Sequence, residues 1–287
     1  MNVVRPRTSS DSATCKTRHK AEERTTRGVQ TYNREKCPSN EVARMRNTIR
    51  TTGLLSLLVA VAGCGDVLGE RIIHGHGPIS IEERHVGRFT GVANSSTADV
   101  EILHGFVEGV FVRAQDNLIP YVRTRVQNDM LHIDTDRDVT LRPRYPIVIE
   151  VDIVTLRNLE STGSGFMRGQ LIDATRLELN SSGAGDIDLP GLLADSLIVI
   201  SSGSGDVTAE GEVQRLRLNM SATGRVDTRD LEAGEAEATI SGSGSATIRV
   251  RDHLRAILSG SGWLRYFGSP EVDADVTGTG QVERQGG

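Results

Sequence analysis

The sequence contains few aromatic residues, few cysteines and no apolar run long enough to cross a membrane. Aromatic residues make up 3% of the 287 positions and apolar residues 37%, whereas glycine occurs 31 times. This composition is poor for the core of a conventional β-sandwich. It favours a coil whose interior is filled by regular ranks of smaller apolar side chains. Cys15, Cys37 and Cys64 all precede residue 65, so no disulfide framework is expected in the rest of the chain.

Charge is distributed unevenly along the chain. Residues 1–44 contain ten Lys or Arg against five Asp or Glu, although the whole chain has a net charge of −5. The remainder is therefore acidic and lacks the clustered cations that neutralise phosphates, which argues against nucleic acid as a partner. Residues 1–44 are rich in Arg, Thr and Ser and show no apolar periodicity, so they are predicted to be disordered.

A secretory leader is predicted over residues 45–63. A basic stretch, residues 45–50, precedes an apolar run at 54–62, and small residues lie directly before Cys64. This order is typical of a signal peptide, and the run is far shorter than the roughly 20 residues of a membrane-spanning helix. The small residues before the cysteine resemble the lipobox of bacterial lipoproteins. That resemblance implies that Cys64 carries diacylglycerol and an N-acyl chain, and that it anchors the protein in a membrane. A plain signal peptide with an incidental cysteine is the alternative.

The leader begins unusually far from the first residue. Either the gene start is over-extended and Met45 is the true initiator, or residues 1–44 are a real cytoplasmic extension. The lipobox resemblance implies a location in the bacterial cell envelope. Gly65 rather than Asp follows the cysteine, which favours an outer-membrane lipoprotein on its periplasmic or surface face. Residues 64–76 are predicted to be a linker.

Gly-x-Gly recurs every 18 to 20 residues in the second half of the chain, with one degenerate copy at Ala222-Thr223-Gly224. We call the first position of each copy the anchor. Apolar residues stand six before, four before and four after it, as Leu177, Leu179 and Ile187 do around Gly183. A period of two indicates strands, and columns of this kind arise when coils stack in register. The sequence therefore predicts an all-β, single-stranded parallel β-helix. The intact anchors are Gly163, Gly183, Gly203, Gly242, Gly260 and Gly278.

Hydroxyl residues flank most anchors and, by parity, face outward. With coils about 4.8 Å apart, their hydroxyls could hydrogen-bond along two ladders. The glycines are expected either where there is no room for an inward Cβ or where φ turns positive. A purely structural ladder is the preferred interpretation. A face that binds sugar or ice-like water is the alternative.

Carboxylates follow the anchors on the same outer face. Asp186, Asp188 and Asp206 should cluster there, with Arg225 and Asp227 beside them. Paired carboxylates can perform acid–base catalysis or hold Ca²⁺, but Arg225 makes surface ion pairs the simpler interpretation. No catalytic triad, phosphate-binding glycine loop or calcium nonapeptide is recognisable, so no catalytic residue, metal or cofactor is predicted. The candidate surface face consists of Asp186, Asp188, Asp206, Asp227, Ser182, Ser202, Ser204 and Ser243.

Residues 77–160 are less periodic but remain β in character. They are predicted to form a β-rich cap over one end of the Gly-x-Gly repeats of residues 161–282. Asn128-Asp129 is a plausible hairpin turn. Trp263 should face outward, toward a C-terminal cap or a ligand. The predicted strand runs include residues 100–102, 110–112, 130–133 and 147–151.

With these features in place, residues 77–282 resemble the bacterial family called "putative auto-transporter adhesin, head GIN domain". The resemblance implies a β-helical fold and an envelope location, but no established activity. The chain departs from the family pattern at residues 95–98 and at Ala222. The matching stretches are Phe-Thr-Gly-Val at 89–92, Asp-Val-Glu-Ile at 99–102, Asp-Asn-Leu-Ile-Pro-Tyr at 116–121, Leu-Arg-Pro at 141–143, and Leu159-Glu160 leading into Gly163-Ser164-Gly165.

Three functions are compatible with these features. The first is a non-enzymatic, lipid-anchored envelope protein of adhesin-like type that binds a glycan or an envelope protein. The second is a carbohydrate-active β-helix enzyme that uses Asp186 and Asp206. The third is a structural or accessory envelope protein without a ligand.

Overall fold

The computed structural model describes residues 71–286. This part of the chain is built from strands, with a single 3₁₀ turn at Ile119–Tyr121, which confirms the predicted all-β class. None of its helical segments is long and apolar enough to cross a membrane. The predictions for residues 1–44, for the signal peptide and for Cys64 fall outside the described residues.

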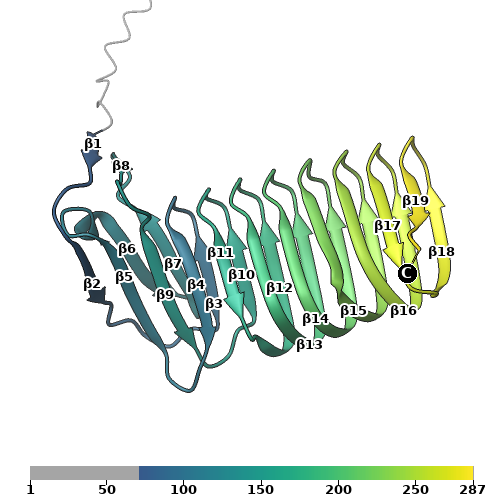
Figure 1. Ribbon diagram of the computed structural model, residues 1–287, viewed down its shortest axis with the longest axis horizontal. Coiled ribbons are helices and arrows are strands. Elements are labelled where there is room, and N and C mark those ends of the chain that lie inside the picture. Colours follow the sequence, from purple (N-terminus) through teal and green to yellow (C-terminus); the bar gives the residue numbers. More distant parts are fainter. Residues whose placement is uncertain (1–70, 287) are drawn as a thin grey trace, which may run out of the picture. The chain divides into compact units, whose positions relative to one another are not determined.

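The Gly-x-Gly repeats form a parallel β-helix, as predicted. Each strand pairs in parallel with its equivalent in the next coil, so the coils lie side by side in Figure 1. The bend inside a coil is marked by shifts in register, for example between Leu189 and Leu192. The strands are β10 (Asn158–Ser161), β11 (Met167–Gln170), β12 (Asp173–Ser181), β13 (Ile187–Ser201), β14 (Val207–Met220), β15 (Arg225–Ile240), β16 (Ser245–Leu258), β17 (Trp263–Phe267), β18 (Glu271–Val276) and β19 (Gln281–Arg284).

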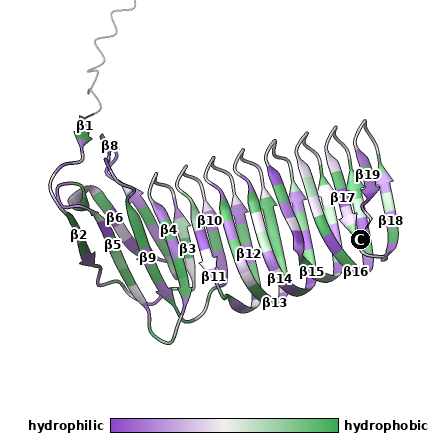
Figure 2. Ribbon diagram, viewed as in Figure 1, coloured by the Kyte–Doolittle hydropathy of each residue, from purple (hydrophilic) through white to green (hydrophobic). Residues whose placement is uncertain are grey.

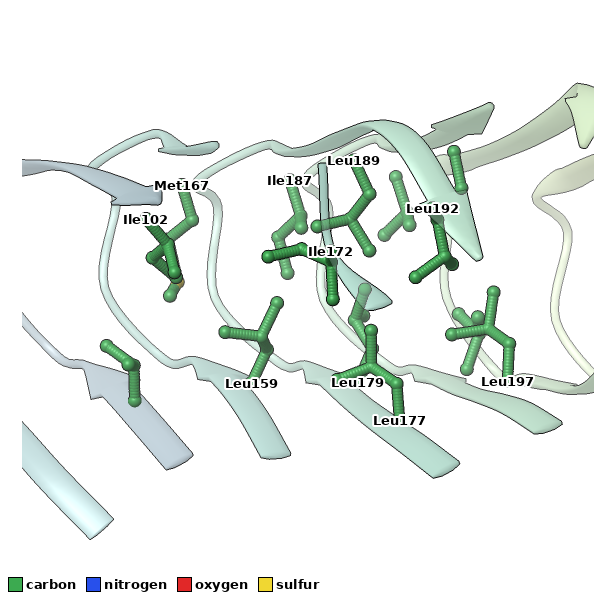
Figure 3. Packing of buried hydrophobic residues seen from close by; sticks show 14 of the residues in the cluster. Ile102, Leu159, Met167, Ile172, Leu177, Leu179, Ile187, Leu189, Leu192 and Leu197 are labelled. Carbon is green, nitrogen blue, oxygen red and sulfur yellow. The ribbon is translucent and has the colours of Figure 1, made fainter. Parts of the chain in front are cut away.

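The interior of the coil is filled by the predicted apolar columns. Met167, Ile187 and Val207 are aligned in register, and each is at most 1% exposed. Leucines of β10, β12 and β13 point at this column from the facing side (Figure 3). Hydrophobic and hydrophilic residues alternate along many of the strands, as Figure 2 shows. Since full burial of one large apolar side chain contributes about 1.5–3 kcal/mol, these columns are the main source of stability.

The N-terminal strands both extend the solenoid and cover its end. The coil of β3 and β4 stacks in parallel on β10 and β11, which aligns Val92 with Leu159 and Val100 with Met167. The coil of β7 and β9 stacks on the other side of β3 and β4. Antiparallel strands then complete this end, where β5 pairs with β9, β2 with β5, and β6 with β7. The bounds are β2 (Ile79–Glu83), β3 (Gly91–Asn94), β4 (Asp99–His104), β5 (Gly109–Gln115), β6 (Val122–Gln127), β7 (Met130–Thr135) and β9 (Val148–Ile153).

Two local expectations can be compared with the structure. Asn128 and Asp129 have φ of 53° and 59° between the antiparallel strands β6 and β7, so the predicted hairpin turn is confirmed. The predicted linker, residues 64–76, contains a strand: β1 (Arg71–His74) pairs in parallel with β8 (Val139–Arg142). This segment forms a strand because the side chain of Ile73 packs against the hydrophobic core.

The last coil, β18 and β19, is paired on one side only within the described residues, β18 with β16 and β19 with β17. Val272 and Val276 are therefore 38% and 42% exposed, whereas their in-register neighbours Leu254 and Leu258 are buried. Trp263 faces outward as predicted. The predicted C-terminal cap is not formed by residues 71–286, and the guanidinium of Arg265 lies 5.5 Å from the Trp263 ring centroid instead.

Candidate functional site

The Gly-x-Gly corners are shaped by close approach of successive coils. A Cβ on Gly183 would lie 2.1 Å from the carbonyl oxygen of Gly163, and one on Gly203 would lie 2.0 Å from that of Gly183. Positive φ is not the cause, because none of the anchor glycines has it. The carbonyl oxygen of Gly163 also joins the two coils, because it accepts hydrogen bonds from the backbone N–H groups of Ala184 and Gly185 at 3.0 and 3.2 Å. The glycines are therefore structural.

The hydroxyl residues beside the anchors face solvent, as parity predicted. Ser182, Ser202, Ser204 and Ser243 are all exposed. Within the described corners, however, the hydroxyls do not hydrogen-bond to one another along the ladder. Among these hydroxyl groups, that of Thr277 alone bonds to the protein in the described corners: it donates to the backbone oxygen of Leu258 at 3.4 Å. The corner is therefore held by its backbone, and the serine hydroxyls remain available to a partner.

The first aspartate after the corner is engaged by the backbone of the next coil. Asp186 Oδ1 accepts a hydrogen bond of 2.8 Å from the N–H of Asp206, and Asp206 Oδ1 accepts one of 2.8 Å from the N–H of Arg225. Asp99 makes the equivalent bond to the N–H of Phe166 at 3.1 Å. These carboxylates therefore cap backbone N–H groups of the neighbouring coil.

The second pair of aspartates is engaged by side chains. Asp188 accepts a hydrogen bond of 2.8 Å from the Thr208 hydroxyl and lies 3.5 Å from Arg168. Asp227 forms an ion pair of 2.7 Å with Arg229 and also accepts a hydrogen bond from its guanidinium. The hydrogen bond and the negative charge of Asp227 raise the pKa of Arg229. No group of His, Cys, Asp or Glu side chains in residues 71–286 is arranged to hold a metal ion.

The predicted candidate face is thus brought together only in part. Asp188, Thr208 and Asp227 lie in one register column, and Arg225 approaches Asp206 at 4.0 Å. The carboxylates cluster as predicted, but each of the four already serves a hydrogen bond or an ion pair within the coil. The exposed serines at the corners lack such partners in the described chain.

A groove of about 760 Å³ lies elsewhere, on the outer face of the strand segments that precede the glycine corners. Two outward register columns cross it. One contains Arg176, Ser196, Arg215, Glu235 and His253, and the other contains Glu178, Ile198, Arg217, Glu237 and Arg255. No single residue type occupies every position of these columns, so the repeat pattern did not predict the groove. The clustering of arginines at one parity in an acidic region is the signal that could have indicated it.

Comparison with known proteins points to one family and one fold. The family model described as "Putative auto-transporter adhesin, head GIN domain" matches residues 88–270. No curated protein matches the chain. A crystal structure named a putative adhesin, from Bacteroides fragilis, is 22% identical, with a TM-score of 0.69 over 74% of this chain and all of that chain. One named a putative lipid binding protein, from Parabacteroides distasonis, is 24% identical, with a TM-score of 0.65 over 75% of this chain and all of that one. At these identities the likenesses show the fold alone.

Proposed function

The chain belongs to the family of the putative auto-transporter adhesin, head GIN domain, and we propose that it is a non-enzymatic, lipid-anchored envelope protein that binds a partner at the cell surface. The family name supplies the adhesin-like role and the envelope location. The observation that carries the proposal is the open groove across successive coils, where charged side chains are presented to solvent from a rigid stack of strands.

The environment of the aspartates supports a binding role over catalysis. A general acid or base must be free to exchange a proton with its substrate. Asp186 and Asp206 instead each accept a backbone N–H of the following coil, which favours a fixed structural carboxylate. Asp188 and Asp227 are held by Thr208 and Arg229.

The lipid anchor is supported by the sequence before Cys64. In the lipidated protein, residues 65–70 would connect the anchor to β1, which begins at Arg71. Even fully extended, a connection of this length spans at most about 25 Å. Several acyl chains on one residue give stable attachment, whereas a single chain gives only marginal binding. The short connection would keep the N-terminal end of the solenoid close to the membrane.

Two experiments test the proposal. In a bacterial host grown with an alkyne fatty acid, the full chain should carry the label and fractionate with membranes, and Cys64→Ser should lose both properties. Equal labelling of the two proteins would contradict the anchor.

The second experiment uses the purified, unlipidated full chain with Cys64→Ser on glycan arrays and on envelope preparations. Saturable binding is expected, and a flat signal on both would contradict the surface-binding role. Turnover of an acidic polysaccharide that is abolished by Asp206→Asn would contradict the non-enzymatic role.

A further inference from the structure

The groove concentrates guanidinium groups in an otherwise acidic region. Arg176, Arg215, Arg217 and Arg255 all line it, and the sequence from residue 45 onward contains no lysine. A guanidinium differs from an ammonium because its planar fork can hold a carboxylate or a sulfate through two parallel hydrogen bonds. The groove is therefore equipped for bidentate recognition of planar or tetrahedral anions.

Most of these arginines already have an acidic partner. Arg217 lies 3.1 Å from Glu237, Arg255 lies 3.7 Å from Asp273, and Arg176 lies 3.6 Å from Glu178. Arg215 is different, because it forms no hydrogen bond or ion pair with any residue in 71–286, although Glu235 follows it in register. An exposed guanidinium without a partner, bordered by other guanidinium groups, is the position in the groove most ready to accept an anion.

The groove runs across strands rather than along one strand. Arg176 and Arg215 occupy one outward column two coils apart, with Ser196 between them, which places them about 9–10 Å apart at the usual strand spacing. A second hollow of about 620 Å³ continues the groove past Thr175 and Arg176 toward Arg157. A linear polymer lying along the stack would therefore meet a guanidinium at more than one of its units.

The acidic side chains of the groove narrow the ligand class. Asp195, Glu235 and Glu237 lie beside the arginines and would repel a polymer that is charged at every unit, such as a polyphosphate. They would accept hydrogen bonds from hydroxyl groups. The groove contains no Phe, Tyr or Trp side chain, although buried anchors of these types are typical of protein–protein interfaces. A sugar chain with spaced anionic groups fits both the mixture of arginines with carboxylates and the lack of Phe, Tyr or Trp anchors.

We propose that this groove binds an anionic glycan, with Arg215 holding a carboxylate or sulfate group of the sugar chain and Arg176 holding a second one. The inference rests on the proposed surface-binding function and names its ligand class. The carboxylates of Asp195, Glu235 and Glu237 accept hydrogen bonds from hydroxyl groups of the same sugar chain. The binding surface is thus the sheet that precedes the glycine corners, and not the predicted face with Asp186 and Ser202.

The test uses the full chain with Cys64→Ser and four immobilised probes: hyaluronan, which has a carboxylate on every second sugar, kappa-carrageenan, which has a sulfate on every second sugar, neutral dextran and poly-L-glutamate. Saturable binding to hyaluronan or kappa-carrageenan is expected, and which of the two is preferred identifies the anion. Arg215→Gln should weaken that binding at least about tenfold, because a charge-assisted hydrogen bond is lost. The control is Arg225→Gln, which removes another exposed arginine, outside the groove, and should change affinity by less than about twofold.

Each other outcome overturns the inference in a distinguishable way. If Arg215→Gln binds as tightly as its parent, or if neutral dextran binds as well as the anionic glycans, the groove assignment fails while the surface-binding role stands. Stronger binding to poly-L-glutamate would assign the groove to an acidic peptide instead. If no probe binds, the anionic-glycan assignment fails, and the envelope-binding experiment above decides the proposed function separately.

Discussion

The carboxylate of Asp186 accepts a hydrogen bond of 2.8 Å from the backbone N–H of Asp206, its equivalent one coil later. Asp206 repeats the bond toward Arg225 at the same distance. An aspartate after a glycine corner therefore fastens one coil to the next. The arrangement explains why two residues that resemble catalytic carboxylates in the sequence serve the stack itself.

Removing this cap should destabilise the stack. Asp206→Ala is expected to lower the free energy of unfolding by about 1 kcal/mol, because the bond is charge-assisted but partly exposed. Asp206→Asn should cost less than about 0.5 kcal/mol, since its side-chain oxygen can still accept the same N–H. Urea unfolding of the full chain measures both. Asp195→Ala, on an exposed aspartate outside the corners, is the control. Equal stability of Asp206→Ala and wild type would show that the bond contributes nothing.

The anchor glycines should tolerate no side chain. Gly203→Ala places a Cβ about 2.0 Å from the carbonyl oxygen of Gly183, so adjacent coils must separate. We expect a loss of about 2 kcal/mol or more, which is typical of overpacking that moves backbone. Gly87→Ala is the matched control, because no atom lies within 4 Å of its added Cβ. The two thermal midpoints should differ by several degrees, and coincident midpoints would refute the steric explanation.

A buried serine column should be replaceable by apolar residues. Ser161, Ser181 and Ser201 are at most 1% exposed, and their hydroxyls have no hydrogen-bond partner among the described protein groups. In the next coils the column continues as Met220 and Ile240. Ser181→Ala is therefore expected to leave stability unchanged or to raise it by up to about 1 kcal/mol, because a buried polar group is removed.

The matched control for this column is another buried hydroxyl. Thr228 is also buried, but its hydroxyl donates to the backbone oxygen of Thr247 at 3.3 Å. Thr228→Val should therefore lower the free energy of unfolding by about 1 kcal/mol. A clear loss of stability in Ser181→Ala, measured in the same urea titrations, would mean that the serine hydroxyl is satisfied in solution and that the prediction is wrong.

Strand β18 of the last coil should resist self-association through its charges. Val272 and Val276 of β18 are partly exposed on the open coil, while Glu271 and Asp275 alternate with them. Charged residues protect an exposed edge, because like charges meet when two such edges pair. The double variant Glu271→Gln, Asp275→Asn should form concentration-dependent dimers in sedimentation experiments. The control removes equal charge from the side of the coil, by Glu210→Gln and Asp195→Asn. Monomers in both variants would exclude this role.

Much of the repeat region could be predicted because its physics is local and recurrent. The parity of a strand assigns Leu177 and Leu179 to the interior, and the spacing of the glycines sets the length of a coil. Steric exclusion at Gly183 acts in the same way in every copy. These constraints act along the chain, so they appear in the sequence as periodic columns.

What the sequence did not predict depends on pairing between distant segments. The coil of β3 and β4 lies between that of β7 and β9 and that of β10 and β11, which no local pattern encodes. The groove around Arg215 likewise arises from unlike residues brought into register across coils.

The sequence by itself thus determined the fold class, the register of the core and the outward direction of the aspartates. Only the tertiary structure decided that Asp186 caps the next coil and that Arg215 has no partner among residues 71–286. The physical reason is that burial follows from the period of two within one strand. Whether an outward side chain is hydrogen-bonded or remains an unpaired charge depends instead on which side chain of the next coil lies beside it, about 5 Å away.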